Sequence, residues 1–114
     1  MPGSGGRDFQ VDVSVSSDER RAVVALGGDL DMNARPELTD AVHRLGAAAP
    51  DRVDVDVAAV RYVGSVLPDF LMEVRQAVPA ASVITVSRPT FWTYFVLRAT
   101  GMAEFVTIED ALSA

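Results

Sequence analysis

The chain has 114 residues, 49% of them hydrophobic and 23% charged, and this balance predicts one globular domain. It contains no cysteine and a single histidine, His43, which excludes disulfides, thiolate nucleophiles, cysteine-bound zinc and multi-histidine metal sites. The formal net charge of −6 argues against nucleic-acid binding, because neutralising phosphates requires a concentrated basic face.

The Gly-rich stretch 1–7 lacks hydrophobic periodicity and is expected to be a disordered lead-in to a single domain at 8–114. No segment approaches the roughly 20 apolar residues of a membrane span, and the first residues lack the apolar run of a secretion signal. We therefore expect a cytoplasmic protein without direct membrane insertion.

The first half of the chain predicts three strands and a helix. Apolar residues alternate with polar ones at 9–16, which indicates a half-buried strand, and a second strand at 21–26, ending at Gly27-Gly28, is its expected hairpin partner. Asn33 is then the predicted N-cap of a helix with Pro36 in its first turn, an apolar stripe over 38–45, and an end weakened by Gly46. Alternation at 51–57 predicts the third strand.

The second half predicts two further helices. Leu67, Phe70, Leu71 and Val74 form the stripe of an amphipathic helix that ends at Pro79. A strand at 82–86, a helix at 90–100 closed by Gly101, a brief strand at 105–108 and a last turn at 109–113 follow. The alternating order predicts an α/β fold, with a mixed sheet of four to five strands, an antiparallel edge and three to four helices packed on the sheet.

Short motifs spread from Val11 to Leu112 resemble the STAS domain family of bacterial anti-sigma factor antagonists. They are Gly28-Asp29-Leu30-Asp31, Pro36-Glu37-Leu38, the strand 53–57, Tyr62-Val63-Gly64-Ser65, the segment 99–105 and Glu109-Asp110-Ala111-Leu112. The resemblance implies a STAS-like fold and a regulator of transcription that acts by protein–protein interaction. Such a regulator binds a kinase-like anti-sigma factor and so frees a sigma factor, and Asp31 and Ser65 are expected near its partner-facing end.

One motif departs from the family pattern. Family members controlled by phosphorylation usually read Asp-Ser-Ser-Gly or Asp-Ser-Thr-Gly, with the second hydroxyl residue as the acceptor, whereas this chain reads Gly64-Ser65-Val66-Leu67. The resemblance thus implies a partner-binding switch loop whose acceptor position is held by Val66, which cannot be phosphorylated. Ser65 is the remaining hydroxyl. It is either a phosphorylation site or, like most Ser residues at a helix start, only an N-cap.

Two pairs of aspartates resemble metal-binding patterns but have a simpler structural interpretation. Asp29 with Asp31, and Asp54 with Asp56, have a spacing that suits Mg²⁺ or Ca²⁺, but the first pair belongs to a turn and the second to the polar side of a strand. No P-loop and no nucleophile–base pair is present. We therefore expect no enzyme, no catalytic residue, no cofactor and no metal site.

The third predicted helix is so apolar that a single sheet cannot bury all its faces. Phe91, Trp92 and Phe95 either belong to a wide core face or form an exposed interface patch for a homodimer or a partner helix. Two functional alternatives also stay open beside the anti-sigma factor antagonist. One is a STAS-type accessory subunit that braces the ATPase of a lipid or anion transporter, and the other is a small-ligand sensor, for which no pocket signature is present.

Overall fold

The structure, a computed structural model, describes residues 8–16, 18 and 20–111, so the expected lead-in at 1–7 lies outside the described residues. The strands are β1 (Phe9–Ser16), β2 (Arg21–Leu30), β3 (Arg52–Val63), β4 (Val83–Ser87) and β5 (Thr107–Ile108). The helices are α1 (Arg35–Ala48), α2 (Val66–Ala77) and α3 (Phe91–Ala99), with two short 3₁₀ turns, η2 (Met32–Ala34) and η3 (Met102–Glu104).

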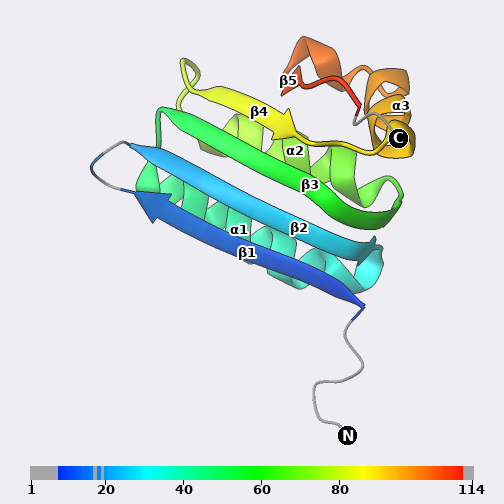
Figure 1. The fold of residues 1–114 in the computed structure, drawn as a ribbon. Coiled ribbons are helices and arrows are strands. Elements are labelled where there is room, and N and C mark those ends of the chain that lie inside the picture. Colours follow the sequence, from blue (N-terminus) through cyan, green and yellow to red (C-terminus); the bar gives the residue numbers. More distant parts are fainter. Residues whose placement is uncertain (1–7, 17, 19, 112–114) are drawn as a thin grey trace, which may run out of the picture.

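The five strands form one sheet in the order β1-β2-β3-β4-β5 (Figure 1). β1 is antiparallel to β2, and all the other neighbours are parallel. Parallel neighbours need a crossover, and α1 and α2 provide the crossovers from β2 to β3 and from β3 to β4. The predicted mixed α/β sheet with an antiparallel edge is confirmed.

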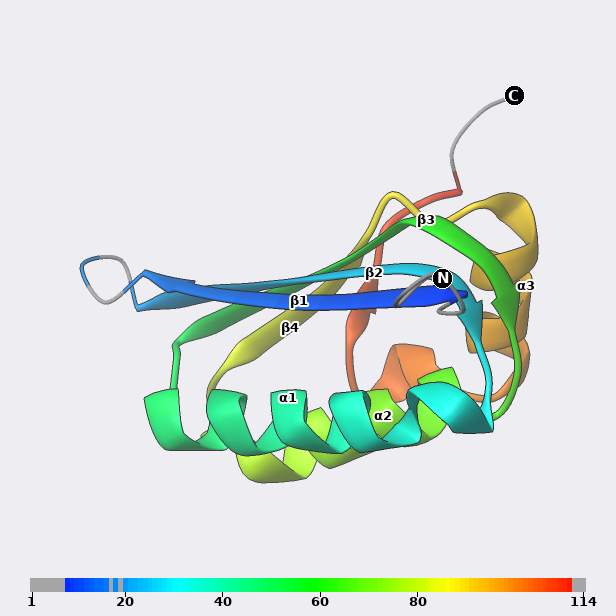
Figure 2. The ribbon, with the colours of Figure 1, turned by 90° about the horizontal axis from the view of Figure 1, so that it is seen from below.

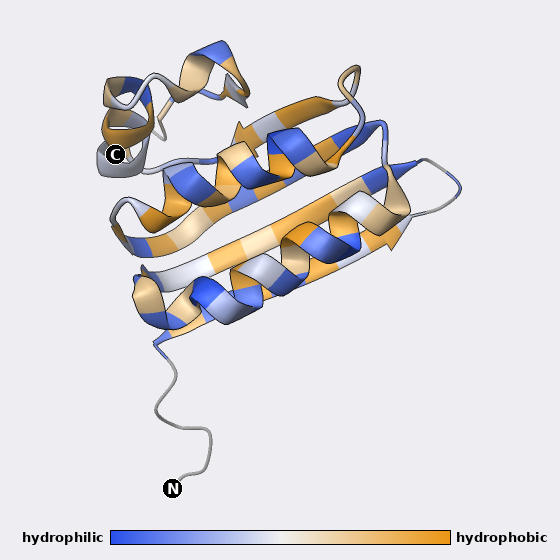
Figure 3. Cartoon of the chain, turned by 180° about the vertical axis from the view of Figure 1, so that it is seen from behind, coloured by the Kyte–Doolittle hydropathy of each residue, from blue (hydrophilic) through white to orange (hydrophobic). Residues whose placement is uncertain are grey.

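The core lies between one face of the sheet and the helices α1 and α2, which pack side by side on that face (Figure 2). The valines of β3 that face the helices are buried, and the apolar residues of α1 and α2 pack into the same layer. Figure 3 shows the two helices from outside, where polar residues alternate with apolar ones. The largest fully buried side chain is Phe70 of α2. α3 lies apart from this layer, at the end of the molecule where β3 ends.

β2 and β3 are longer than predicted, because Gly27-Gly28 forms an irregularity inside a strand and not a stop. Gly28 has a φ of 75°, and the register between β2 and β3 shifts on both sides of it. The pairing then continues to the end of both strands. At each of the two shifts β3 has one residue more than β2, so β3 bulges beside Gly27-Gly28 while both strands continue. The predicted ends at Leu26 and Val57 are therefore wrong.

Two predicted local features also differ in the structure. Asp31, and not Asn33, is the capping residue: its carboxylate accepts a hydrogen bond from the Asn33 N–H at 2.9 Å and starts η2, one turn before α1. Residues 109–111 form no helical turn, and the rest of the last predicted turn lies outside the described residues. α3 agrees with its prediction to within one residue at each end, with Thr90 as its N-cap.

Candidate functional site

The predicted loop residues leave the sheet from neighbouring strand ends. Leu30 and Val63 form the last pair of the parallel ladder between β2 and β3. Asp31 follows the first of these residues, and Gly64, Ser65 and Val66 follow the second (Figure 1). Because parallel strands end at the same edge, the structure brings the four predicted residues to one end of the sheet. We call these two adjacent segments, Asp31 and Gly64–Val66, the docking loop, after the partner-binding role that the resemblance implies.

Ser65 occupies the N-cap position of α2 but does not cap it. Its backbone is already helical, with φ −64° and ψ −18°, and its side chain makes no capping hydrogen bond. A capping Ser normally has an extended backbone, which aims the hydroxyl at the first free N–H groups. The interpretation of Ser65 as an N-cap is therefore wrong, and its exposed hydroxyl does not stabilise the helix in this way.

Val66 points into the protein. It is only 4% exposed and belongs to the hydrophobic core, together with the following residues of α2, Leu67 and Phe70. The position that corresponds by resemblance to the family's phosphoacceptor thus has neither a hydroxyl nor access to solvent. This burial is a tertiary fact that residue type alone does not reveal.

Tyr62 and Met32 are exposed neighbours of the docking loop in the chain, and sequence reasoning did not select them. A Cβ added to Gly64 would lie 3.2 Å from the Tyr62 hydroxyl oxygen, so the Tyr62 side chain lies against the loop. Met32, in η2 directly after Asp31, is 71% exposed. Both are large, mainly apolar residues directly beside a motif of small and polar residues. That pattern in the sequence would have identified them as candidate site residues.

The aromatic residues of α3 face outward. Phe91, Trp92 and Phe95 are 70%, 56% and 52% exposed, and the last two rings stack with centroids 5.8 Å apart. The helix buries Thr93 and Leu97 instead. The prediction that these residues belong to a wide core face is therefore wrong, and they form an exposed patch.

Asp54 and Asp56 of β3 each form an ion pair with an arginine. Asp54 lies 2.5 Å from Arg21 of β2, and Asp56 is paired with Arg88, which precedes α3. Burial opposes ionisation of Asp56, but hydrogen bonds from Arg88 and the Ala58 N–H, with the charge of Arg88, outweigh it and lower the pKa of Asp56. Within the described part of the chain, no three His, Asp or Glu residues gather as a metal site would require.

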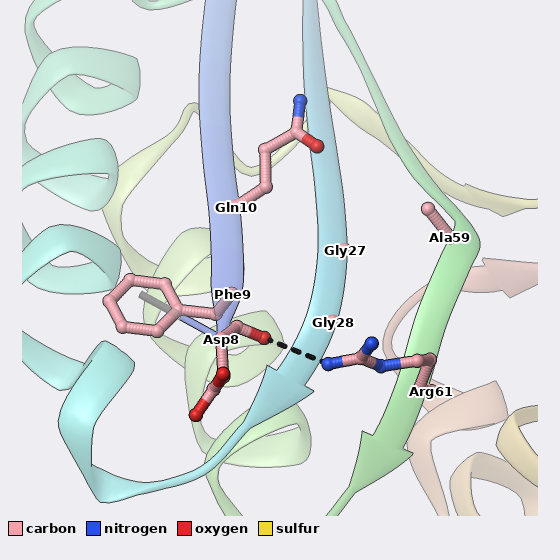
Figure 4. Close-up of a pocket in the computed structure, with 7 residues that line it drawn as sticks. All are labelled: Asp8, Phe9, Gln10, Gly27, Gly28, Ala59 and Arg61. Carbon is pink, nitrogen blue, oxygen red and sulfur yellow. Dashed lines mark hydrogen bonds between the residues drawn. The ribbon is translucent and has the colours of Figure 1, made fainter. Parts of the chain in front are cut away.

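A hollow of about 390 Å³ lies over Gly27 and Gly28 of β2 (Figure 4). Its lining comes from β1, β2 and β3 and from the residue before β1: Asp8, Phe9, Gln10, Gly27, Gly28, Ala59 and Arg61. The Arg61 guanidinium donates to the Asp8 carbonyl oxygen at 3.5 Å and also lies 3.5 Å from Asp29. The Arg61 cation already has a carboxylate partner, so it is not an uncommitted positive charge for an anionic ligand.

None of the helices at 8–111, as far as the structure describes them, has both the length and the apolar character needed to cross a membrane.

Comparison with known proteins identifies related folds. A protein-family model described as "Mlab, STAS domain" matches residues 13–108, whereas no curated protein matches the chain. The crystal structure of an anti-sigma factor antagonist from Mycobacterium paratuberculosis is similar, with a TM-score of 0.79 and 22% identity over 91% of this chain and 87% of that one. The structure of the anti-sigma factor antagonist SpoIIAA in its unphosphorylated form has a TM-score of 0.63 and 15% identity over 90% and 88% of the two chains.

Proposed function

Since the chain belongs to the STAS domain family, we propose that it is a non-enzymatic anti-sigma factor antagonist. In this role it binds a kinase-like anti-sigma factor in the cytoplasm and so frees a sigma factor for transcription. The two similar solved folds, both of anti-sigma factor antagonists, support the proposal. The observation that carries it is the docking loop, because Asp31 and the exposed Ser65 lie at neighbouring strand ends where a partner protein has access to them.

The proposed switch is degenerate and stays in its partner-competent form. In a phosphorylated relative, a phosphate of about −1.5 to −2 charge at the start of a helix would change how a partner docks. Here Val66 has no hydroxyl and is buried, which supports a loop that a kinase leaves unmodified. Ser65 is the only hydroxyl residue of the docking loop, so it is the position at which this idea is tested.

Capture from the native host tests the proposed partner. The tagged full chain should retain a kinase-like anti-sigma factor, identified by mass spectrometry, and Ser65→Ala should retain it equally. Ser65→Glu should lose it, because the new charge lies at the docking loop. Gln76→Glu, an exposed position near the other end of α2, is the matched control for charge and should bind as the wild type does.

Other outcomes of the capture contradict the proposal. Recovery of a transporter ATPase that depends on the same loop would replace the sigma pathway with the transporter-associated role. Binding that is indifferent to Ser65→Glu would place the interface elsewhere. Intact-mass analysis after incubation with the captured kinase should show no added phosphate, and a phosphate on Ser65 would disprove the degenerate switch.

A further inference from the structure

α3 has its more apolar side outside. Its exposed side carries Phe91, Trp92, Phe95 and Ala99, at the spacing of one helical stripe, whereas its buried residues are Thr93 and Leu97. A helix of nine residues is short for independent stability and depends on tertiary contacts. A sequence that leaves three aromatic rings in water on such a helix indicates a surface that is covered by something else.

We propose that this stripe is a homodimer interface in which two copies of α3 pack antiparallel about a two-fold axis at Phe95. An isologous contact requires a surface that complements itself. An axis at residue 95 places residues at equal distances before and after it opposite one another. Phe95 then meets its own copy, Phe91 faces Ala99 of the second copy, and Trp92 faces Arg98 of the second copy.

Each of these pairs is chemically favourable. Phe91 against Ala99 matches a large residue with a small one, which lets two helices approach closely. Arg98 already lies 5.8 Å from the ring centroid of Tyr94 in its own chain, and a Trp face is the best aromatic partner for a guanidinium. Antiparallel helices also oppose their dipoles, so the positive end of each lies beside the negative end of the other.

Charge favours a second copy at this face over the rest of the surface. The chain carries a formal charge of −6, which opposes self-association in general. α3 has no acidic residue, and its only charged residue is Arg98. The helix-to-helix contact therefore contains no carboxylate of α3 itself, and the pairing brings each Arg98 to an aromatic ring and not to another cation.

The size of the patch sets the strength of the dimer. From the exposed fractions of the three aromatic residues, they offer roughly 350 Å² per copy. A standard interface buries about 800 Å² per partner. The dimer is therefore weak and forms as the protein concentration rises. Its contact residues belong to α3 and not to the docking loop, so the dimer is tested with the purified chain alone, although both surfaces lie at the end of the molecule where β3 ends (Figure 1 and Figure 2).

The experiment follows the mass and the fluorescence of the purified chain over a range of concentrations. Trp92 is the only tryptophan, so its emission reports directly on this contact. Sedimentation equilibrium should show the mass rising toward twice the monomer value, and the emission should shift to shorter wavelength over the same range. A wild-type chain that stays monomeric, with unshifted emission, would overturn the proposal and leave the patch to a partner helix.

Charge variants test the two-fold axis itself. Phe95→Asp and Phe95→Arg should each be monomeric, because each brings two like charges together at the axis, and an equal mixture of the two should regain the dimer mass. The recovery also shows that both variants fold. Met32→Asp adds the same charge at another exposed apolar position and should dimerise like the wild type. A mixture that stays monomeric, or a monomeric Met32→Asp, would contradict pairing about Phe95.

Discussion

Leu30 and Val63 lie opposite each other as the last parallel pair of β2 and β3. This pairing is possible because β2 continues past Gly28, and β3 continues beside it with one extra residue at each of two register shifts. The Asp29 N–H donates to the Asp8 carbonyl oxygen at 2.8 Å just beyond it. The geometry of the docking loop therefore depends on a glycine three residues before Asp31.

Replacing Gly28 by Ala should destabilise the protein by about 1 to 3 kcal/mol. The added Cβ would lie 2.0 Å from the Asp8 carbonyl oxygen, and φ is 75° there. Gly64→Ala is the matched control, since its Cβ would meet the end of the exposed Tyr62 side chain, which can move. Its cost should stay below about 1 kcal/mol. Urea denaturation measures both, and equal losses would mean that a Cβ at Gly28 meets no special steric or conformational cost.

A hydroxyl introduced at position 66 should destabilise the folded state and should not make this position a phosphorylation site. Val66→Thr keeps the shape and buries a hydroxyl, so the free energy of unfolding should fall by about 1 to 3 kcal/mol. Val83→Thr, the same substitution at an exposed position of β4, should change it by less than about 0.5 kcal/mol. Intact mass after incubation with the partner kinase should stay unmodified, and efficient phosphorylation of Thr at 66 would contradict the burial.

The Asp56–Arg88 pair should make stability pH-dependent at the acid end. Because the folded pKa of Asp56 is lowered, the stabilisation is present above the unfolded pKa of about 3.9 and is lost as the pH falls through the folded pKa. Both partners are partly exposed, so solvent screens the pair and its contribution to stability is small.

Thermal unfolding at about pH 6 and about pH 3 checks this dependence. Asp56→Asn should lose less stability between the two than the wild type does. Asp40→Asn, at an exposed position of α1, should keep the wild-type dependence. An unchanged pH profile in Asp56→Asn would show that the pair does not contribute.

Replacing Arg75, near the end of α2, by Lys should lower the stability of the protein. Its guanidinium donates to the carbonyl oxygens of Ser82 at 2.9 Å, Pro79 at 2.8 Å and Ala80 at 3.3 Å, which closes the connection to β4. Lys keeps the charge but not the planar fork, so Arg75→Lys should cost about 1 to 2 kcal/mol in chemical denaturation. Arg52→Lys, at an exposed position, should be near neutral, and a similar loss in both variants would argue against the fork.

The local pattern of apolar and polar residues was sufficient to predict the order of the strands and helices. The alternation along β1 and the apolar stripes of α1 and α2 are properties of neighbouring residues, and the structure buries those stripes as predicted. The mixed sheet followed from the order of strands and helices. Pattern failed at Gly27-Gly28 because a glycine pair looks the same in a turn and inside a strand. It failed at Ser65 because capping depends on backbone angles that residue type does not reveal.

The sequence by itself determined the order of the main strands and helices, and it established that Val66 carries no hydroxyl and that the chain is acidic without cysteine. Only the tertiary structure decided that Val66 is buried, that Asp31 and Ser65 leave the sheet from neighbouring strands, and that the aromatic residues of α3 face outward. The physical reason is that periodicity defines the faces of a helix or strand, whereas long-range packing chooses which face meets the core.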